Sequence, residues 1–283
     1  MNATTLIIIA VLVVGGILGV TFYNRNQFEL PRGETREFIV TNTNQEEPMT
    51  TNEQKSVDQS TDQNDTAGVV STSRRTSTRK VLVTDGVKHS IPLGEILSGG
   101  PPKDGIPSID NPKFISTKDA EAFLDDSAVG LGVSVQGESR FYPYQILVWH
   151  EIVNDTIAGQ PVLVTYCPLC ATGIVFDRRV AGVEQEFGVS GKLWQSNLLM
   201  YNRAGNEKAE SLWSQVLGEA VLGQNTGEKL AIIRSDTVRY SDWKKLHKDT
   251  RVLSKDTGAA RSYGRDPYGN YYTNESVSFG ATF

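Results

Sequence analysis

The two cysteines of the chain, Cys167 and Cys170, lie three positions apart in the segment Tyr-Cys-Pro-Leu-Cys, and no other cysteine occurs among the 283 residues. A tight turn with this spacing can direct two thiolates at one metal ion, and Pro168 suits such a turn. The same spacing serves thiol–disulfide exchange. A disulfide that closes so short a loop removes little entropy from the unfolded chain, so bracing the turn is a third role. All three roles are open on the sequence alone.

Metal binding is the first prediction. Two thiolates with one imidazole suit zinc, or copper in its reduced state. The natural third ligand is His150, which we expect on a helix just before the strand that delivers Cys167. Glu151 and Asp155, expected one turn apart on that helix, are further candidates as ligands or as a general base. Ala171 departs from the pattern, because metal knuckles favour Gly at a position that needs a positive φ.

Thiol–disulfide redox chemistry through Cys167 and Cys170 is the alternative. We expect Cys167 to attack, since it precedes Pro168 and should be the more exposed thiol. The sequence after Cys170 is typical of a strand, so no helix N-terminus is expected to activate either thiol.

A non-enzymatic module that binds a protein partner or a glycan is the third prediction. In that case the cysteines only brace a turn, and His150 is an ordinary buried or helix-end histidine. Trp194, Trp213, Arg265 and Tyr268, which stand in segments rich in polar and aromatic residues, would line a pocket or interface.

The elements that carry these residues are mostly short strands. Hairpins are predicted over 129–142, turning at Gln136-Gly137, and over 173–189, turning near Ala181-Gly182, and residues 161–166 form an apolar strand. Helices are predicted over 117–124, 143–152 and 241–247. The fold class is therefore α+β, a strand-rich single globular domain with a few short helices. It lacks the phosphate-binding loops and the hydrolase motifs that have recognisable sequence signatures.

Composition divides the chain into an anchor over 1–24, a flexible polar linker over 25–78 and the globular domain over 79–283. Residues 3–23 carry no charge and are long enough to cross a bilayer, so we predict a single-pass membrane protein. The linker is too poor in apolar residues to fold alone. It resembles an external stalk, which favours an extracytoplasmic domain, although Arg25, Arg32 and Arg36 favour the opposite orientation.

The charge balance excludes one class of partner. With a net charge of −5 and a pI of about 5.4, the chain offers no basic field for nucleic acid phosphates. The membrane is the one partner that the sequence predicts; a protein or small-molecule partner is not identified.

Seven segments, in order, resemble an uncharacterised family catalogued as domain of unknown function 3179. They are 103–112 (KDGIPSIDNP), 149–155 (WHEIVND), 165–170 (TYCPLC), 176–178 (FDR), 196–201 (SNLLMY), 212–215 (LWSQ) and 263–268 (YGRDPY). The resemblance extends over about Lys103 to Tyr272. It implies a single-domain, membrane-anchored or exported protein, and it carries over no catalytic residues because the family has no established activity.

Overall fold

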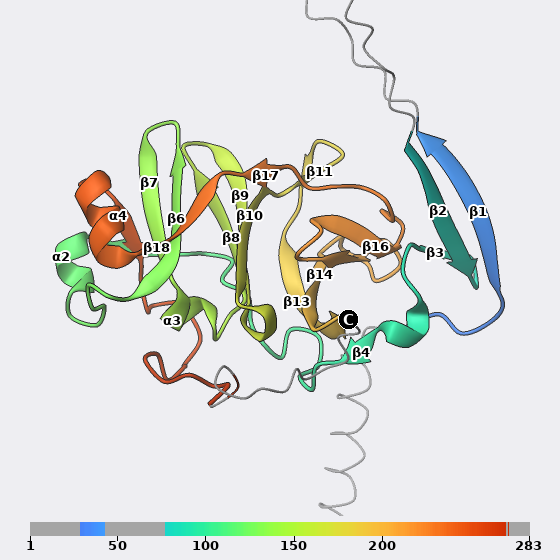
Figure 1. Ribbon diagram of the computed structural model, residues 1–283, viewed down its shortest axis with the longest axis horizontal. Helices are drawn as coiled ribbons and strands as arrows, with labels where there is room; N and C mark the ends of the chain where they lie inside the picture. The colour runs from blue at the N-terminus through green and yellow to red at the C-terminus, as the bar shows by residue number, and fades with distance from the viewer. Residues whose placement is uncertain (1–28, 43–76, 270, 272–283) are drawn as a thin grey trace, which may run out of the picture.

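The computed structural model describes residues 29–42, 77–269 and 271. Three sheets follow one another along the long axis of the molecule (Figure 1). A five-stranded sheet with two helices lies at one end, a four-stranded sheet in the middle, and an eight-stranded sheet at the other end. This arrangement confirms a strand-rich α+β domain with few, short helices.

The eight-stranded sheet has the order β1-β2-β3-β16-β15-β14-β13-β4. Its strands are β1 (Thr35–Asn42), β2 (Ser77–Thr84), β3 (Val87–His89), β16 (Glu219–Gly223), β15 (Ser211–Ser214), β14 (Asn197–Asn202), β13 (Phe187–Trp194) and β4 (Leu97–Ser98). The four-stranded sheet comprises β17 (Ile232–Ile233), β10 (Thr172–Asp177), β9 (Gln160–Cys167) and β8 (Ile152–Ile157).

The five-stranded sheet has the order β18-β6-β7-β19-β5, with β18 (Ser235–Arg239), β6 (Val129–Val135), β7 (Glu138–Pro143), β19 (Arg251–Leu253) and β5 (Phe114–Ile115). β11 (Arg179–Val180) and β12 (Val183–Glu184) form a small separate ribbon. The helices are α2 (Thr117–Ala120), α3 (Tyr144–Leu147) and α4 (Tyr240–Leu246), with 3₁₀ turns η1 (Leu93–Glu95) and η2 (Pro168–Cys170).

The middle sheet is buried on both faces. Val153, Val164 and Val175 lie side by side across β8, β9 and β10 and pack toward the five-stranded sheet. Leu163 and Phe176 face the other way, into a cluster shared with the eight-stranded sheet. Burial on both faces explains why 161–166 is continuously apolar instead of alternating.

The hairpin predicted over 129–142 is confirmed, whereas the one predicted over 173–189 is confirmed only for the ribbon 179–184, because β10 pairs with β9 and β13 pairs with β14. β6 and β7 are joined at Gln136-Gly137, and β11 and β12 at Ala181-Gly182, with positive φ at all four residues. Two positive φ values in a two-residue loop characterise the turn that matches the twist of a hairpin. The predicted strand over 161–166 is the centre of β9.

The helix predicted over 143–152 is shorter than expected, because α3 ends at Leu147 and Glu151 adopts a left-handed φ of 60° just before β8. Glu151 and Asp155 therefore do not share a helix face, and that expectation is wrong. Likewise α2 covers one turn, capped by the Ser116 hydroxyl, which accepts a hydrogen bond from the Asp119 backbone N–H at 3.1 Å.

The predicted anchor over 1–24 lies outside the described residues, as does most of the predicted linker. In the part of the chain that the structure describes, no helix is long and apolar enough to cross a membrane. Residues 35–42, within the range that composition assigns to the linker, form β1 and pair with β2 along their full length.

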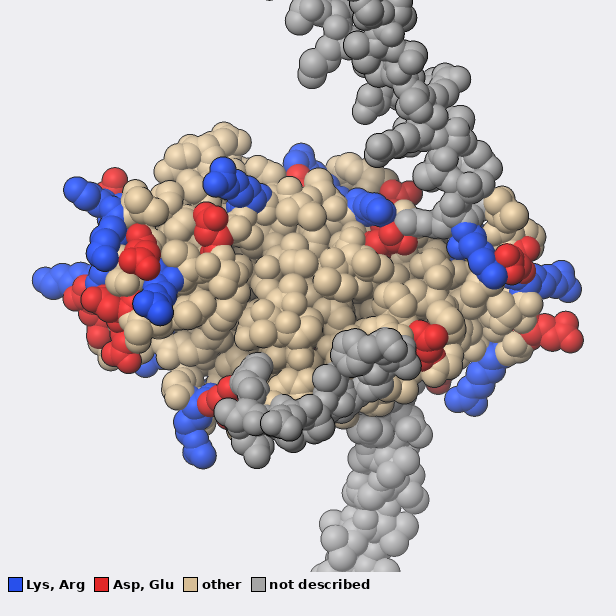
Figure 2. Space-filling view, in the orientation of Figure 1, with Lys and Arg blue, Asp and Glu red and all other residues tan. Residues whose placement is uncertain are grey.

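The surface carries charges of both signs. On the face shown in Figure 2, lysine, arginine and carboxylate side chains gather mainly toward the two ends, and the middle is largely uncharged.

Candidate functional site: the Cys turn and the adjacent cavity

The Cys turn, residues 167–171, connects the two central strands of the middle sheet. β9 ends at Cys167, Pro168 begins the 3₁₀ turn η2, and β10 begins at Thr172, which pairs with Cys167 across the sheet. Ala171 adopts a left-handed φ of 49°, the conformation for which glycine is favoured. The chain reverses within one tight turn, and this turn brings both thiols to the end of the sheet.

The two thiols are free and differ in burial. Cys167 is 1% exposed, whereas Cys170 is exposed. The expectation that Cys167 is the more exposed thiol is therefore wrong. Cys167 lies on the same face of β9 as Leu163, and both pack into the cluster shared with the eight-stranded sheet.

The two thiols interact, and the interaction favours a thiolate at Cys170. A hydrogen bond from the Cys167 thiol is the main cause that lowers the pKa of Cys170 to about 6. Hydrogen bonds from Thr172 and Asn197 lower it further, against the effect of burial. The same thiol–thiol hydrogen bond, together with burial, raises the pKa of Cys167. The pair is thus one activated thiol and one neutral thiol.

A buried amide pair holds this arrangement in place. Asn197 donates through Nδ2 to the Cys170 sulfur at 3.3 Å and to Oε1 of Gln215 at 2.9 Å. Gln215 in turn donates to the Thr165 hydroxyl at 3.0 Å and to the Thr172 carbonyl at 3.1 Å. The amides connect β14 and the end of β15 to β9 and β10, so the environment of Cys170 depends on both sheets.

His150 is fully buried, and both of its ring nitrogens have partners. Nδ1 lies 2.8 Å from the Pro107 carbonyl and Nε2 lies 2.7 Å from the Tyr263 hydroxyl. Because a carbonyl oxygen only accepts, Nδ1 carries the proton and Nε2 accepts from Tyr263. Burial lowers the pKa of His150, which favours this neutral form. The imidazole therefore connects the loop before β5 to the C-terminal segment.

Glu151 is a buried carboxyl with a raised pKa near the Cys turn. It is 6% exposed and accepts a hydrogen bond from the Tyr268 hydroxyl at 3.0 Å. Burial raises its pKa to about 7; the Tyr268 hydrogen bond opposes this rise and the Cys170 charge adds to it. Its electrostatic coupling to Cys170 places Glu151 in the surroundings of the Cys turn. Asp155, by contrast, lies on β8, bonded to Arg140 and to the Tyr142 hydroxyl.

A cavity of about 370 Å³ lies beside the Cys turn. Its wall is mainly apolar, and Leu169, the residue between Pro168 and Cys170, contributes to it. Three charged side chains also line it: Glu151, Lys192 and Arg261. This volume and this balance of apolar and polar groups are typical of small-molecule sites.

A charged network fixes the loop that forms one wall of the cavity. Arg203 donates to Asp104 at 3.1 Å, to Ser108 at 2.9 Å and to Asp110 at 2.7 Å. The Tyr201 hydroxyl also bonds to Asp104. Residues 104–110 are thereby fastened to β14, and the neighbouring loop residues face the cavity.

The other residues singled out by sequence have different environments. Tyr268 lines the cavity, and Arg265 lines a smaller hollow of about 220 Å³. Trp194 is half-buried and donates to the Glu95 carboxylate at 2.8 Å. Trp213 is fully buried in the core.

In the part of the chain that the structure describes, no third ligand lies near the two cysteines to complete the predicted metal site. Among residues 29–42, 77–269 and 271, no group of three or more His, Cys, Asp or Glu side chains is placed to hold a metal ion. Zinc sites require at least three protein ligands.

Sequence reasoning missed Lys192, Arg261, Asn197 and Gln215. Lys192 interrupts an apolar strand, which is a local signal of a special environment. Asn197 and Gln215 stand in two of the segments that carry the family resemblance. Arg261 has no comparable signal, because its position depends on how the C-terminal segment packs.

Fold and site together define a strand-rich α+β domain in which a two-cysteine turn adjoins an apolar cavity. A family model described as a protein of unknown function, DUF3179, matches residues 103–282, and the chain belongs to this family. No curated protein and no solved structure matches the chain. Six family-like segments supply the site: 103–112, 149–155, 165–170, 196–201, 212–215 and 263–268.

Proposed function

We propose that the domain is a thiol–disulfide redox protein in which Cys170 attacks and Cys167 resolves. The observation that carries the proposal is the asymmetry of the pair: an exposed thiol with a pKa of about 6 beside a buried neutral thiol that donates to it. A low thiol pKa with access to solvent defines a reactive cysteine.

The reaction would proceed in two exchange steps with a disulfide of a partner molecule. The Cys170 thiolate attacks one partner sulfur, the partner S–S bond breaks, and the other partner sulfur leaves and takes up a proton. Cys167 then loses its proton and attacks the Cys170 sulfur, which releases the second partner thiol. The protein loses two electrons and forms the Cys167–Cys170 disulfide, and the partner disulfide becomes a dithiol.

The test exposes the reduced full-length chain to oxidised glutathione and follows the products by mass spectrometry. The wild type should form the internal disulfide, because Cys167 resolves the mixed one. Cys167→Ser should stop at a stable mixed disulfide on Cys170. Cys170→Ser should react far more slowly, because only the buried thiol of raised pKa remains.

The pH dependence of alkylation gives a second measurement. Half of Cys170 should be in its reactive thiolate form near pH 6 in the wild type, and at higher pH in Cys167→Ala or Thr172→Val, each of which removes a side-chain hydrogen bond to the thiolate. Thr226→Val is the matched control, since its hydroxyl donates to carbonyls of Lys88 and Gly223. Equal reactivity of the two cysteines would overturn the proposal. Tight zinc or copper binding by the reduced protein, lost in both cysteine variants, would favour the metal prediction instead.

A further inference from the structure

Two cations line the cavity beside the Cys turn, and no acid within the described ranges forms an ion pair with either of them. None of the described residues forms an ion pair or hydrogen bond with the Lys192 ammonium. Burial alone lowers the pKa of this half-buried group. Arg261 donates only to the Ala260 carbonyl at 3.1 Å in the described part of the chain. A cation that loses hydration without gaining a partner costs free energy. Both cations are therefore suited to pair with an anionic group of a ligand.

Among the described residues that line the cavity, the one acid is Glu151, and its hydrogen-bond partner is Tyr268. Glu151 accepts from Tyr268, and neither Lys192 nor Arg261 contributes to its pKa of about 7. Lys192 and Arg261 therefore do not neutralise a negative charge on Glu151. Below about pH 6 the Glu151 carboxyl is largely protonated, and it then does not repel an anion in the same cavity.

The rest of the wall is suited to an apolar body. Seven of the lining side chains are large and apolar: Ile106, Val148, Trp149, Leu169, Val189, Leu193 and Leu198. The loop that carries Ile106 is held by the Arg203 network, and Trp149 donates to the Arg265 carbonyl at 3.1 Å. The walls are thus fixed by polar contacts outside the cavity, and the cavity is largely formed before any ligand enters.

We propose that this cavity binds a small molecule that combines an apolar body with one carboxylate, the body lying against the apolar wall and the carboxylate pairing with Lys192 and Arg261. This inference does not depend on redox chemistry at the cysteines. It assigns a ligand class to a site for which the family offers none.

The test titrates the full-length chain with decanoate, decanol and decylammonium, which share an apolar chain and differ in charge. Calorimetry should show saturable binding of decanoate, roughly a hundredfold tighter than decanol, because the carboxylate gains two charge-assisted contacts that contribute about tenfold each. Decylammonium should bind more weakly than either. Trp149 fluorescence should change on binding, and Trp149→Phe should remove that change.

Charge-removing variants locate the carboxylate. Lys192→Met and Arg261→Met should each lower decanoate affinity roughly tenfold and leave decanol affinity unchanged. Lys208→Met, an exposed lysine in a different hollow, is the matched control and should change nothing. Val148→Phe should weaken all three probes by filling the cavity. If that variant fails to fold, the Lys192 and Arg261 variants still test the proposal. Equal affinity for the three probes, no saturable binding, or parallel loss of decanoate and decanol in Lys192→Met would overturn it.

Discussion

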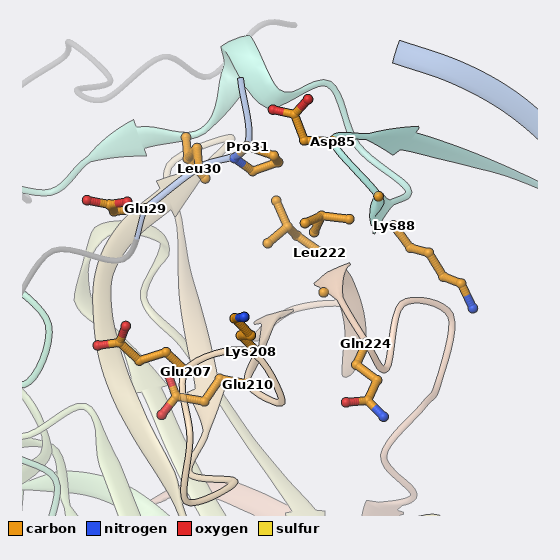
Figure 3. A pocket seen from close by; sticks show the side chains of 13 residues that line it. Glu29, Leu30, Pro31, Asp85, Lys88, Glu207, Lys208, Glu210, Leu222 and Gln224 are labelled. Atoms are coloured by element: carbon orange, nitrogen blue, oxygen red, sulfur yellow. The ribbon is translucent and has the colours of Figure 1, made fainter. Parts of the chain in front are cut away.

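The cavity beside the Cys turn and the groove near the β1–β2 ribbon are two hollows that both contain glutamate and lysine side chains, in different environments. The groove encloses about 550 Å³ against about 370 Å³ for the cavity. Its lining charges are mostly exposed, and Figure 3 shows Lys88 and Gln224 extending away from Glu207 and Glu210. In the cavity, by contrast, Glu151 is buried and Lys192 is half-buried.

The difference shows that size does not identify a site. Groove charges keep their hydration, and Glu210 is already paired with Lys103 at 2.6 Å. Charges in the cavity have lost water and so respond strongly to a ligand, to pH or to substitution. Matched substitutions in the two hollows should therefore have effects that differ in size or in sign.

The largest expected difference concerns the two glutamates. The pKa of Glu151 is about 7 in the folded protein, against an ordinary value of 4.5 for an exposed glutamate. Between these values the unfolded chain releases the proton and the folded chain keeps it, so the free energy of unfolding falls as pH rises through this window. Glu151→Gln removes that loss and should stabilise the protein at pH 8 by up to about 3 kcal/mol, with little effect at pH 5.

Urea unfolding at pH 5 and pH 8 measures this effect. Glu207→Gln, an exposed glutamate of the groove, is the control and should stay within about 0.5 kcal/mol at both values. A Glu151→Gln variant with the same stability change at both pH values would show that the buried carboxyl is ionised throughout.

The sequence predicts the strands and turns around this site better than it predicts the chemistry of the site. The turns at Gln136-Gly137 and Ala181-Gly182 and the apolar strand before Cys167 are local features, and their residues determine them. The Cys turn and six of the family-like segments also lie together around the candidate site. The chemistry depends on contacts between residues far apart, such as Tyr268 with Glu151, 117 positions away, and Asn197 with Cys170, 27 positions away.

The relative burial of the thiols illustrates the same limit. Nothing in Cys-Pro-Leu-Cys says which thiol faces the eight-stranded sheet, because that depends on how β9 packs against β14. The helix expected to carry Glu151 and Asp155 fails for a related reason. The apolar residues after Pro143 form one turn of helix, α3. The chain beyond it becomes extended because β8 pairs with β9.

The second expected difference concerns the walls of the two hollows. Arg203→Gln removes donors from Asp104, Ser108 and Asp110, and should lower the free energy of unfolding by about 1–2 kcal/mol. Hydrogen exchange should also increase in residues 104–110, because their attachment to β14 is weakened. Lys88→Gln in the groove should change stability by less than about 0.5 kcal/mol. Unchanged exchange in the loop would mean that backbone contacts alone hold the cavity wall.

The smallest expected difference compares one substitution at two alanines. Ala171 in the Cys turn has a φ of 49°, where a side chain costs about 1–2 kcal/mol, whereas Ala209 beside the groove has no positive φ. Glycine lowers stability by about 0.5–1 kcal/mol where it only loosens the unfolded chain. Ala171→Gly should therefore stabilise the protein by about 0.5 kcal/mol, and Ala209→Gly should destabilise it by a similar amount.

Both variants change the unfolded chain in the same way, so the difference between them isolates the backbone conformation of the Cys turn. Urea unfolding at one pH measures it. Two destabilising effects of equal size would show that Ala171 is not held in the left-handed region, and the turn that sets the two thiols against each other would then need a different geometry.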